Sequence, residues 1–266
     1  MTRRPLFPAR VEPFAAPPNA PKKVANSAGG TPATGRNGLN IATAARAQGV
    51  GLDSAAVRER MVRRLAEQGI AHPELLAAMA AVERHRFVDS ALVNQAYEDT
   101  SLPIGLGQTI SKPSVVARMI ELLLQGVDGA QRKTGRLLEV GTGCGYQAAL
   151  LSRLAREVYS IERLRGLHEK ARANLRPFRL PNLHLLFGDG MQGFAQGAPY
   201  ASIIAAAGGS SIPQPWIDQL AVGGRIVAPI EGGGQQTLIV IDKLEQGVRR
   251  SVLETVHFVP LKSGVA

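Results

Sequence analysis

Three glycines in a short turn are the first sign of a ligand site in this sequence. Gly141, Gly143 and Gly145 form a G-x-G-x-G pattern directly after an apolar run. Glycine lets a backbone turn tightly and approach a ligand closely. Glu162 lies seventeen residues after Gly145, and its carboxylate can accept both hydroxyl hydrogens of a ribose. Asp189, in a Gly-Asp-Gly run, can accept a hydrogen bond from an adenine amine.

The spacing of the glycines separates two kinds of adenosine cofactor. Dinucleotide binding requires G-x-G-x-x-G, with a helix N-terminus at the pyrophosphate. Position 146 is Tyr rather than Gly, which argues against an NAD-dependent dehydrogenase. S-adenosylmethionine has no phosphate and needs no such cradle. The alternative, in which Glu162 and Asp189 only cap helices, does not explain why each follows a predicted strand.

The elements that must position these residues alternate between strands and helices. We expect strands over residues 136–140, 158–161, 183–187, 201–206 and 225–230, and helices over residues 147–155, 164–175 and 212–220. This alternation predicts an α/β, doubly wound Rossmann-like fold with a mostly parallel sheet and helices on both faces. Ligands of such sheets bind outside the carboxyl ends of the strands. Two β-rich runs, 237–244 and 253–261, follow without a helix between them, so we expect antiparallel C-terminal strands.

Residues 1–52 differ in composition from the rest of the chain. They are rich in Pro, Ala and Gly and show no helical or strand period, so we expect a disordered N-terminal extension. Order is expected to begin at Asp53 and Ser54, a plausible helix N-cap, with one helix ending at Gly69 and another starting at Pro73. We therefore expect one folded domain over residues 53–266, with a helical and substrate-binding segment over residues 53–135.

Charge and composition restrict the possible partners. The net charge is +10, and residues 1–50 contain seven Lys or Arg but one acid, Glu12. This excess of positive charge indicates a solubilising extension, or a segment that contacts anionic surfaces without specificity. We expect no specific binding of nucleic acid. The single cysteine, Cys144, excludes an internal disulfide and favours the cytoplasm. The histidines are scattered, so we expect no metal site. The chain has no apolar run long enough to span a membrane. We also expect a monomer.

Several stretches resemble one family along most of the chain. Residues 107–113, Gly-Gln-Thr-Ile-Ser-Lys-Pro, resemble the signature upstream of the core in protein-L-isoaspartate O-methyltransferases, and residues 138–147 resemble that family's cofactor loop. Residues 160–163, 188–190, 219–225 and 256–261 are also similar to the family. The resemblance extends from about Val57 to about Lys262. Its specific part is the Gln-Thr-Ile-Ser segment, since many methyltransferases share the glycine loop.

The resemblance implies an activity, a cofactor and a set of site residues. It implies transfer of a methyl group from S-adenosylmethionine to the α-carboxylate of L-isoaspartyl residues in damaged peptides and proteins. The ester then collapses to a succinimide, which can reopen as aspartate. Ser111 corresponds to the family's active-site serine. The residues expected to bind the cofactor are Gln108, Thr109, Ile110, Gly141, Thr142, Gly143, Gly145, Glu162, Asp189 and Gly190.

The chemistry requires few side chains. A carboxylate is already ionised near pH 7, so no general base is needed, and the protein must mainly align the reacting atoms. Ser111 can donate a hydrogen bond that orients the carboxylate, although a serine before x-Pro is also common in loops.

The sequence departs from the family pattern in two places. Ala201 stands where the family has Asp, and residues 205–209 read Ala-Ala-Ala-Gly-Gly. The second departure leaves open a methyltransferase with a different acceptor. A non-catalytic module that binds nucleic acid through its basic tail is supported by charge alone.

Overall fold

The computed structural model describes residues 55–126 and 135–266. The predicted disordered extension over residues 1–52 and the predicted N-cap at Asp53 and Ser54 lie outside these residues. Helix α1 (Ala55–Glu67) and helix α2 (Pro73–Ala81) lie on either side of Gly69, as the sequence predicts. Gly69 has φ +99°, a conformation that favours glycine and ends α1.

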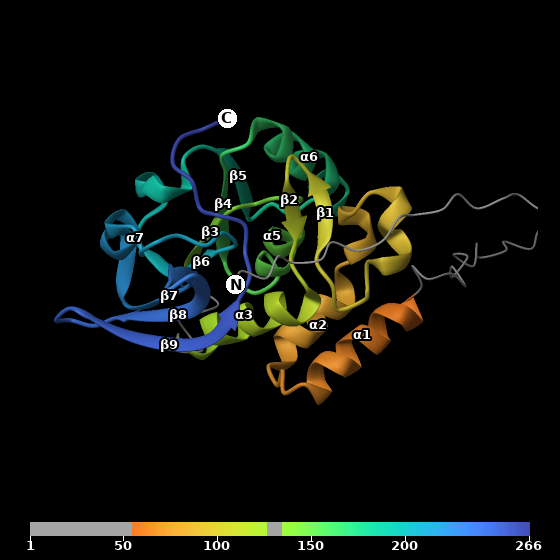
Figure 1. Ribbon diagram of the computed structural model, residues 1–266, viewed down its shortest axis with the longest axis horizontal. Coiled ribbons are helices and arrows are strands. Elements are labelled where there is room, and N and C mark those ends of the chain that lie inside the picture. Colours follow the sequence, from red (N-terminus) through yellow and green to blue (C-terminus); the bar gives the residue numbers. More distant parts are fainter. Residues whose placement is uncertain (1–54, 127–134) are drawn as a thin grey trace, which may run out of the picture. The chain divides into compact units, whose positions relative to one another are not determined.

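A seven-stranded sheet forms the centre of the described domain (Figure 1). The spatial order is β5-β4-β3-β6-β7-β8-β9. The five parallel strands are β3 (Arg136–Val140), β4 (Glu157–Glu162), β5 (Leu183–Phe187), β6 (Tyr200–Ala205) and β7 (Leu220–Gly232). β8 (Gln235–Lys243) and β9 (Val248–Val256) are antiparallel. The predicted fold class is confirmed.

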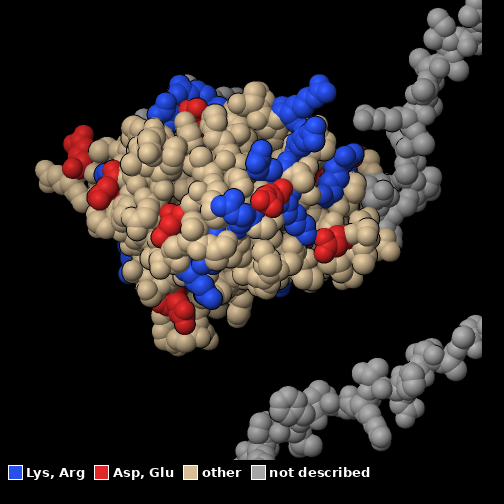
Figure 2. All heavy atoms as spheres, turned by 90° about the horizontal axis from the view of Figure 1, so that it is seen from above, with Lys and Arg blue, Asp and Glu red and all other residues tan. Residues whose placement is uncertain are grey.

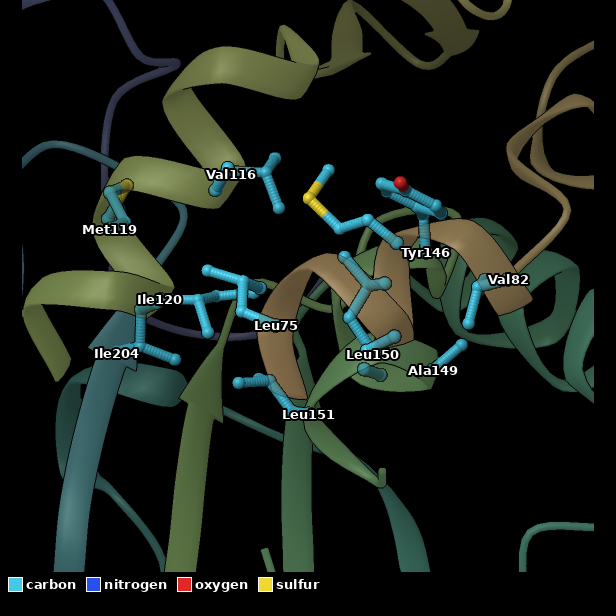
Figure 3. Packing of buried hydrophobic residues seen from close by; sticks show 14 of the residues in the cluster. Leu75, Val82, Val116, Met119, Ile120, Tyr146, Ala149, Leu150, Leu151 and Ile204 are labelled. Atoms are coloured by element: carbon cyan, nitrogen blue, oxygen red, sulfur yellow. The ribbon is translucent and has the colours of Figure 1, made fainter. Parts of the chain in front are cut away.

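Helices cover both faces of this sheet. They are α3 (Pro113–Gln125), α5 (Tyr146–Leu151), α6 (Arg165–Leu175) and α7 (Gln214–Gln219). Successive side chains of a strand point to opposite faces, and β3 shows this: Leu137 lies in one buried cluster, whereas Leu138 lies in another with Trp216 of α7. Figure 3 shows the first cluster, where α2, α3 and α5 contribute side chains such as Leu75, Ile120 and Leu150.

A β-hairpin precedes α3 and was not anticipated from the sequence pattern. β1 (Leu102–Gly105) pairs antiparallel with β2 (Gln108–Ile110). Its turn, Gly105-Leu106-Gly107, has φ values of +96°, +51° and +69°. Two short 3₁₀ helices, η1 (Arg84–Phe87) and η2 (Ser90–Gln95), connect α2 to this hairpin. Three more follow later in the chain: η3 (Arg176–Phe178), η4 (Gly190–Gln192) and η5 (Ala195–Gly197).

The predicted strand over residues 253–261 is wrong in its bounds. β9 ends at Val256, and the following residues leave the sheet. At this point the side-chain amide of Gln236 takes the place of a backbone partner from β8. Its nitrogen donates to the Phe258 carbonyl (3.0 Å), and its oxygen accepts from the Phe258 N–H (2.6 Å). Pro260 has no N–H with which to continue a strand. Residues 257–266 are therefore free to cross the end of the sheet.

Two predicted helices are shorter than expected. α5 begins at Tyr146 and ends at Leu151, against a prediction of 147–155, and α7 is confined to Gln214–Gln219, against 212–220. Pro213 is the N-cap of α7, and β7 starts directly after the helix, at Leu220. Pairing of Leu220 with Tyr200 of β6 explains why the chain becomes extended there.

Candidate functional site

A cavity of about 270 Å³ lies at the carboxyl ends of β3 and β4. Its wall comes from the β1–β2 hairpin, the turn after β3, the end of β4 and the C-terminal residues 259–262. Nine of the eleven predicted site residues line it: Gln108, Thr109, Ile110, Ser111, Gly141, Thr142, Gly143, Glu162 and Gly190. Gly145 and Asp189 are not part of its wall.

The glycine turn is held in shape by β4. Gly141 and Gly143 have φ values of +91° and +57°, which a side chain would strain. The N–H groups of Gly141 and Thr142 both donate to the Ile161 carbonyl, at 2.9 Å and 3.2 Å. The turn therefore stands at a fixed position beside the end of β4.

Glu162 is a buried carboxylate with backbone partners on both oxygens. Its side chain accepts from the Gly143 N–H and from the Leu164 N–H, each at 2.9 Å, and the residue is 5% exposed. A carboxylate oxygen can accept more than one hydrogen bond, so acceptor capacity remains at the cavity wall. The helix-capping interpretation accounts for the Leu164 contact but not for the contact with the glycine turn.

Asp189 and Gly145 serve neighbouring parts of the chain. One carboxylate oxygen of Asp189 accepts from the Met191 N–H (2.9 Å) and the other accepts from the Gly264 N–H (2.8 Å). Asp189 thus caps η4 and holds the C-terminal segment. A Cβ on Gly145 would lie 2.7 Å from Leu175 of α6, so glycine there permits close packing of that helix.

Gly190 lies in the cavity wall and tolerates no side chain. A Cβ at this position would lie 2.5 Å from Cγ1 of Val140. The indole Nε1–H of Trp216 donates to the Gly190 carbonyl at 2.8 Å. Gly190 is therefore fixed between the end of β3 and α7.

The C-terminal segment is a part of the site that sequence analysis missed. Val259, Pro260, Leu261 and Lys262 line the cavity. The Gly208 N–H donates to the Val259 carbonyl (2.8 Å), and the Leu261 N–H donates to the Gly208 carbonyl (2.7 Å). The sequence pattern favours a strand here because the run is apolar. Pro260 within the run is the signal that could have indicated the end of the ladder.

Ser111 lies in the loop between β2 and α3, half-buried in the cavity wall. Within residues 55–126 and 135–266, its hydroxyl has no hydrogen-bond partner, so it remains available to a ligand.

The departures from the family pattern fall at opposite ends of β6. Ala206 and Ala207 line the cavity, whereas Ala201 lies near the amino end of the strand, away from the site.

A buried polar chain lies beneath the glycine turn. The Ser160 hydroxyl donates to the Glu139 carboxyl (2.5 Å) and hydrogen-bonds the Thr142 hydroxyl (2.6 Å). Burial raises the pKa of Glu139 to about 8 from its ordinary 4.5, although hydrogen bonds from Ser160 and Gln147 oppose the shift. Glu162 adds a like charge in the same direction. Glu139 therefore keeps its proton at neutral pH.

We expect Glu139→Gln to remove a pH dependence of stability. In the folded chain Glu139 keeps its proton up to about pH 8, whereas in the unfolded chain it loses the proton near pH 4.5. The free energy of unfolding of the wild type therefore falls as the pH rises between these two values, by up to about 1.4 kcal/mol per pH unit. Urea unfolding from pH 5 to 9 should show the variant gaining stability over the wild type as the pH rises. A difference that does not change with pH would contradict this.

The described part of the chain contains neither a cluster of potential metal ligands nor a helix that could cross a membrane. In residues 55–126 and 135–266, no three His, Cys, Asp or Glu side chains gather as metal ligands would. None of the helices in those ranges combines the length and the apolar character that crossing a bilayer requires.

Comparison with known proteins gives one consistent result. Residues 56–266 match the family model described as protein-L-isoaspartate(D-aspartate) O-methyltransferase. The chain is 63% identical over 219 residues to the protein-L-isoaspartate O-methyltransferase of Methylibium petroleiphilum, covering 81% of each chain. It is 58% identical to that of Leptothrix cholodnii, covering 82% of this chain and 77% of the relative. A solved structure of a protein-L-isoaspartate O-methyltransferase is similar with a TM-score of 0.70 and 27% identity, covering 78% of this chain and 67% of that one.

Proposed function

Because the chain belongs to the protein-L-isoaspartate(D-aspartate) O-methyltransferase family, we propose that Glu162 binds the cofactor's ribose and Ser111 orients the substrate. The chain transfers a methyl group from S-adenosylmethionine to the α-carboxylate of L-isoaspartyl residues in damaged peptides and proteins. The resulting ester can form a succinimide and reopen as aspartate. The substrates are isoaspartyl-containing peptides and proteins.

The observation that carries the cofactor proposal is the buried Glu162 carboxylate in a glycine-lined wall. Its known partners are both backbone N–H groups, so it has lone pairs left for two ribose hydroxyls. Ile104, Val140 and Ile161 add apolar surface to the cavity, which suits an adenine ring. This acceptor and the apolar wall fit S-adenosylmethionine, which supplies an activated methyl group on a sulfonium.

The protein's own residues need to orient and enclose the reactants. We assign to Ser111 a hydrogen bond that holds the α-carboxylate in line with the methyl group. The carboxylate is already ionised near pH 7, so no general base is needed. Gln108, Thr109 and Ile110 place this serine beside the glycine turn. Residues 259–262 and the β1–β2 hairpin cover the reacting ends, and a dry site favours a step that neutralises opposite charges.

The surface charge supports an anionic substrate. Figure 2 shows the face that carries α6 and the C-terminal end of the chain, and Lys and Arg outnumber Asp and Glu there. Arg163 and Lys262 line the cavity itself. A positive field of this kind increases the rate at which acidic ligands arrive and weakens with added salt.

A methyl-transfer assay with two peptides tests the function directly. A peptide with one L-isoaspartyl residue should accept label from radiolabelled S-adenosylmethionine, and the same peptide with L-aspartate should not. Equal labelling of both peptides, or labelling of neither, would contradict the proposed activity. Label on a small molecule with none on the isoaspartyl peptide would instead favour a different acceptor.

Two finer proposals concern the state of the protein in the cell. We propose that it works in the cytoplasm, which suits a chain whose one cysteine, Cys144, is buried and free. We also propose that the protein is a monomer. Light scattering coupled to size-exclusion chromatography tests the second proposal, and a dimer mass would overturn it.

A further inference from the structure

Arg84 is a fully buried cation whose partners are all uncharged. It lies in η1 and is 0% exposed. Its Nε donates to the Ala96 carbonyl (2.8 Å), its Nη2 donates to the Ser111 carbonyl (2.7 Å), and its guanidinium lies over the Tyr146 ring at 4.8 Å. Among the described residues, no carboxylate forms a salt bridge with it. Buried charges are usually paired, so this arrangement has a cost that needs an explanation.

Two of the three partners of Arg84, Ser111 and Tyr146, belong to segments that line the cavity. Ser111 is in the loop before α3, and Tyr146 is the first residue of α5, immediately after Gly145. Figure 3 shows the Tyr146 ring in the buried layer that also contains Val116 of α3. The rings of Phe87 and Tyr146 form a T-shaped pair with centroids 5.6 Å apart. The guanidinium therefore joins the loop that carries Ser111 to the end of the glycine turn.

We propose that Arg84 is a positioning residue that holds the Ser111 loop against the glycine turn, so that the Ser111 hydroxyl meets the substrate carboxylate. This inference rests on the proposed function of Ser111. A rigid donor plane suits the task, because guanidinium can hold two carbonyls in fixed directions while stacking on a ring. Arg84 Nη1 has no partner in the described residues, so the other two nitrogens and the ring hold the group.

Arg84 contacts the backbone of Ser111 and not its side chain. Arg84 holds the carbonyl of Ser111, and the Asp99 carboxylate independently holds the first turn of α3 by accepting from the Ser114 N–H (2.9 Å) and hydroxyl (2.8 Å). With the backbone held on both sides, the Cα of Ser111 has a defined position from which its hydroxyl can reach the substrate. Loss of the Arg84 contact should release one end, and small misplacements of an orienting group lower turnover strongly.

The test is a double-mutant cycle between Arg84→Lys and Ser111→Ala. Lysine keeps the charge but cannot reach both carbonyls in fixed directions. We expect Arg84→Lys to lower kcat/KM for the isoaspartyl peptide at least about tenfold, while the dissociation constant of S-adenosylhomocysteine changes less than about threefold. In the Ser111→Ala background the same substitution should cost less than about twofold, because the group that it positions is absent. Additive losses would overturn the inference.

Controls separate positioning from general damage to the core. Arg225→Lys alters another largely buried arginine that donates to a backbone carbonyl, that of Leu122 at 2.8 Å, far from the cavity wall. It should lower the melting temperature and leave kcat/KM unchanged. If Arg84→Lys does not fold, Tyr146→Leu removes the ring under the guanidinium without altering Arg84, and the same non-additivity with Ser111→Ala is expected.

The outcomes also separate this inference from the proposed function. A wild-type enzyme that does not methylate the isoaspartyl peptide overturns the function itself. A wild-type enzyme that does so, combined with an Arg84→Lys variant of unchanged kcat/KM, overturns only the role of Arg84.

Discussion

Replacing Glu162 by alanine is expected to weaken S-adenosylhomocysteine binding by at least about 100-fold. The carboxylate would offer two hydrogen bonds to the ribose, each worth about 1.5–3 kcal/mol when one partner is charged, and 1.4 kcal/mol corresponds to a tenfold change in affinity. The substitution also leaves the N–H groups of Gly143 and Leu164 without their acceptor, which loosens the glycine turn. Isothermal titration calorimetry with S-adenosylhomocysteine measures the loss.

A matched control lies at the other end of the same strand. Glu157 begins β4 and bonds Arg136 (2.9 Å) on the side away from the cavity. Glu157→Gln should change the dissociation constant less than about twofold. The melting temperature of each ligand-free variant checks that it is folded. A Glu162→Ala protein that is folded and binds the cofactor product within threefold of the wild type would refute the assignment of Glu162.

The glycine turn and Glu162 could be placed from the sequence because local rules determine them. A short apolar run followed by glycines indicates a strand end, and parallel strands bring their carboxyl ends to one edge of the sheet. The register of β3 on β4 aligns Val140 with Ile161, so Gly141 and Glu162 must be neighbours. Any sequence that forms these two strands places the turn and the acid together.

Asp189 shows the limit of that reasoning. It follows β5 as predicted, at the same edge of the sheet. Its carboxylate binds the N–H groups of Met191 and Gly264, and Gly190 rather than Asp189 lines the cavity. Position at a strand end is predictable, but which way a side chain turns depends on partners that are distant in sequence.

The remaining parts of the site depend on long-range packing. The hairpin turn at Leu106, the C-terminal residues 259–262 and Arg84 contribute to the site from segments far from the glycine turn. A buried arginine with carbonyl partners has no sequence signature, because Arg residues are usually exposed. The Ser111 loop was identified through its resemblance to a family rather than from any local pattern.

Ser111→Ala is expected to lower kcat/KM for the isoaspartyl peptide by about 10- to 100-fold while leaving cofactor affinity unchanged. One hydrogen bond to a charged carboxylate is worth about 1.5–3 kcal/mol, and each 1.36 kcal/mol on the barrier is tenfold in rate. Among the described residues the hydroxyl has no hydrogen-bond partner, so its removal disturbs little of the fold. Steady-state methyl transfer to isoaspartyl and aspartyl peptides measures the loss.

We expect the loss of kcat/KM in Ser111→Ala to come from the missing hydroxyl and not from a change in the shape of the loop. Ser111→Thr tests that distinction. Threonine keeps the donor and adds one methyl group, so it should recover part of the activity that alanine loses. Both variants retain the hydrogen bond from Arg84 to the carbonyl of residue 111. Equal turnover in the alanine variant and the wild type would show that the substrate carboxylate is oriented by another group, and the cavity residues Gln108 and Thr109 would then be the next to substitute.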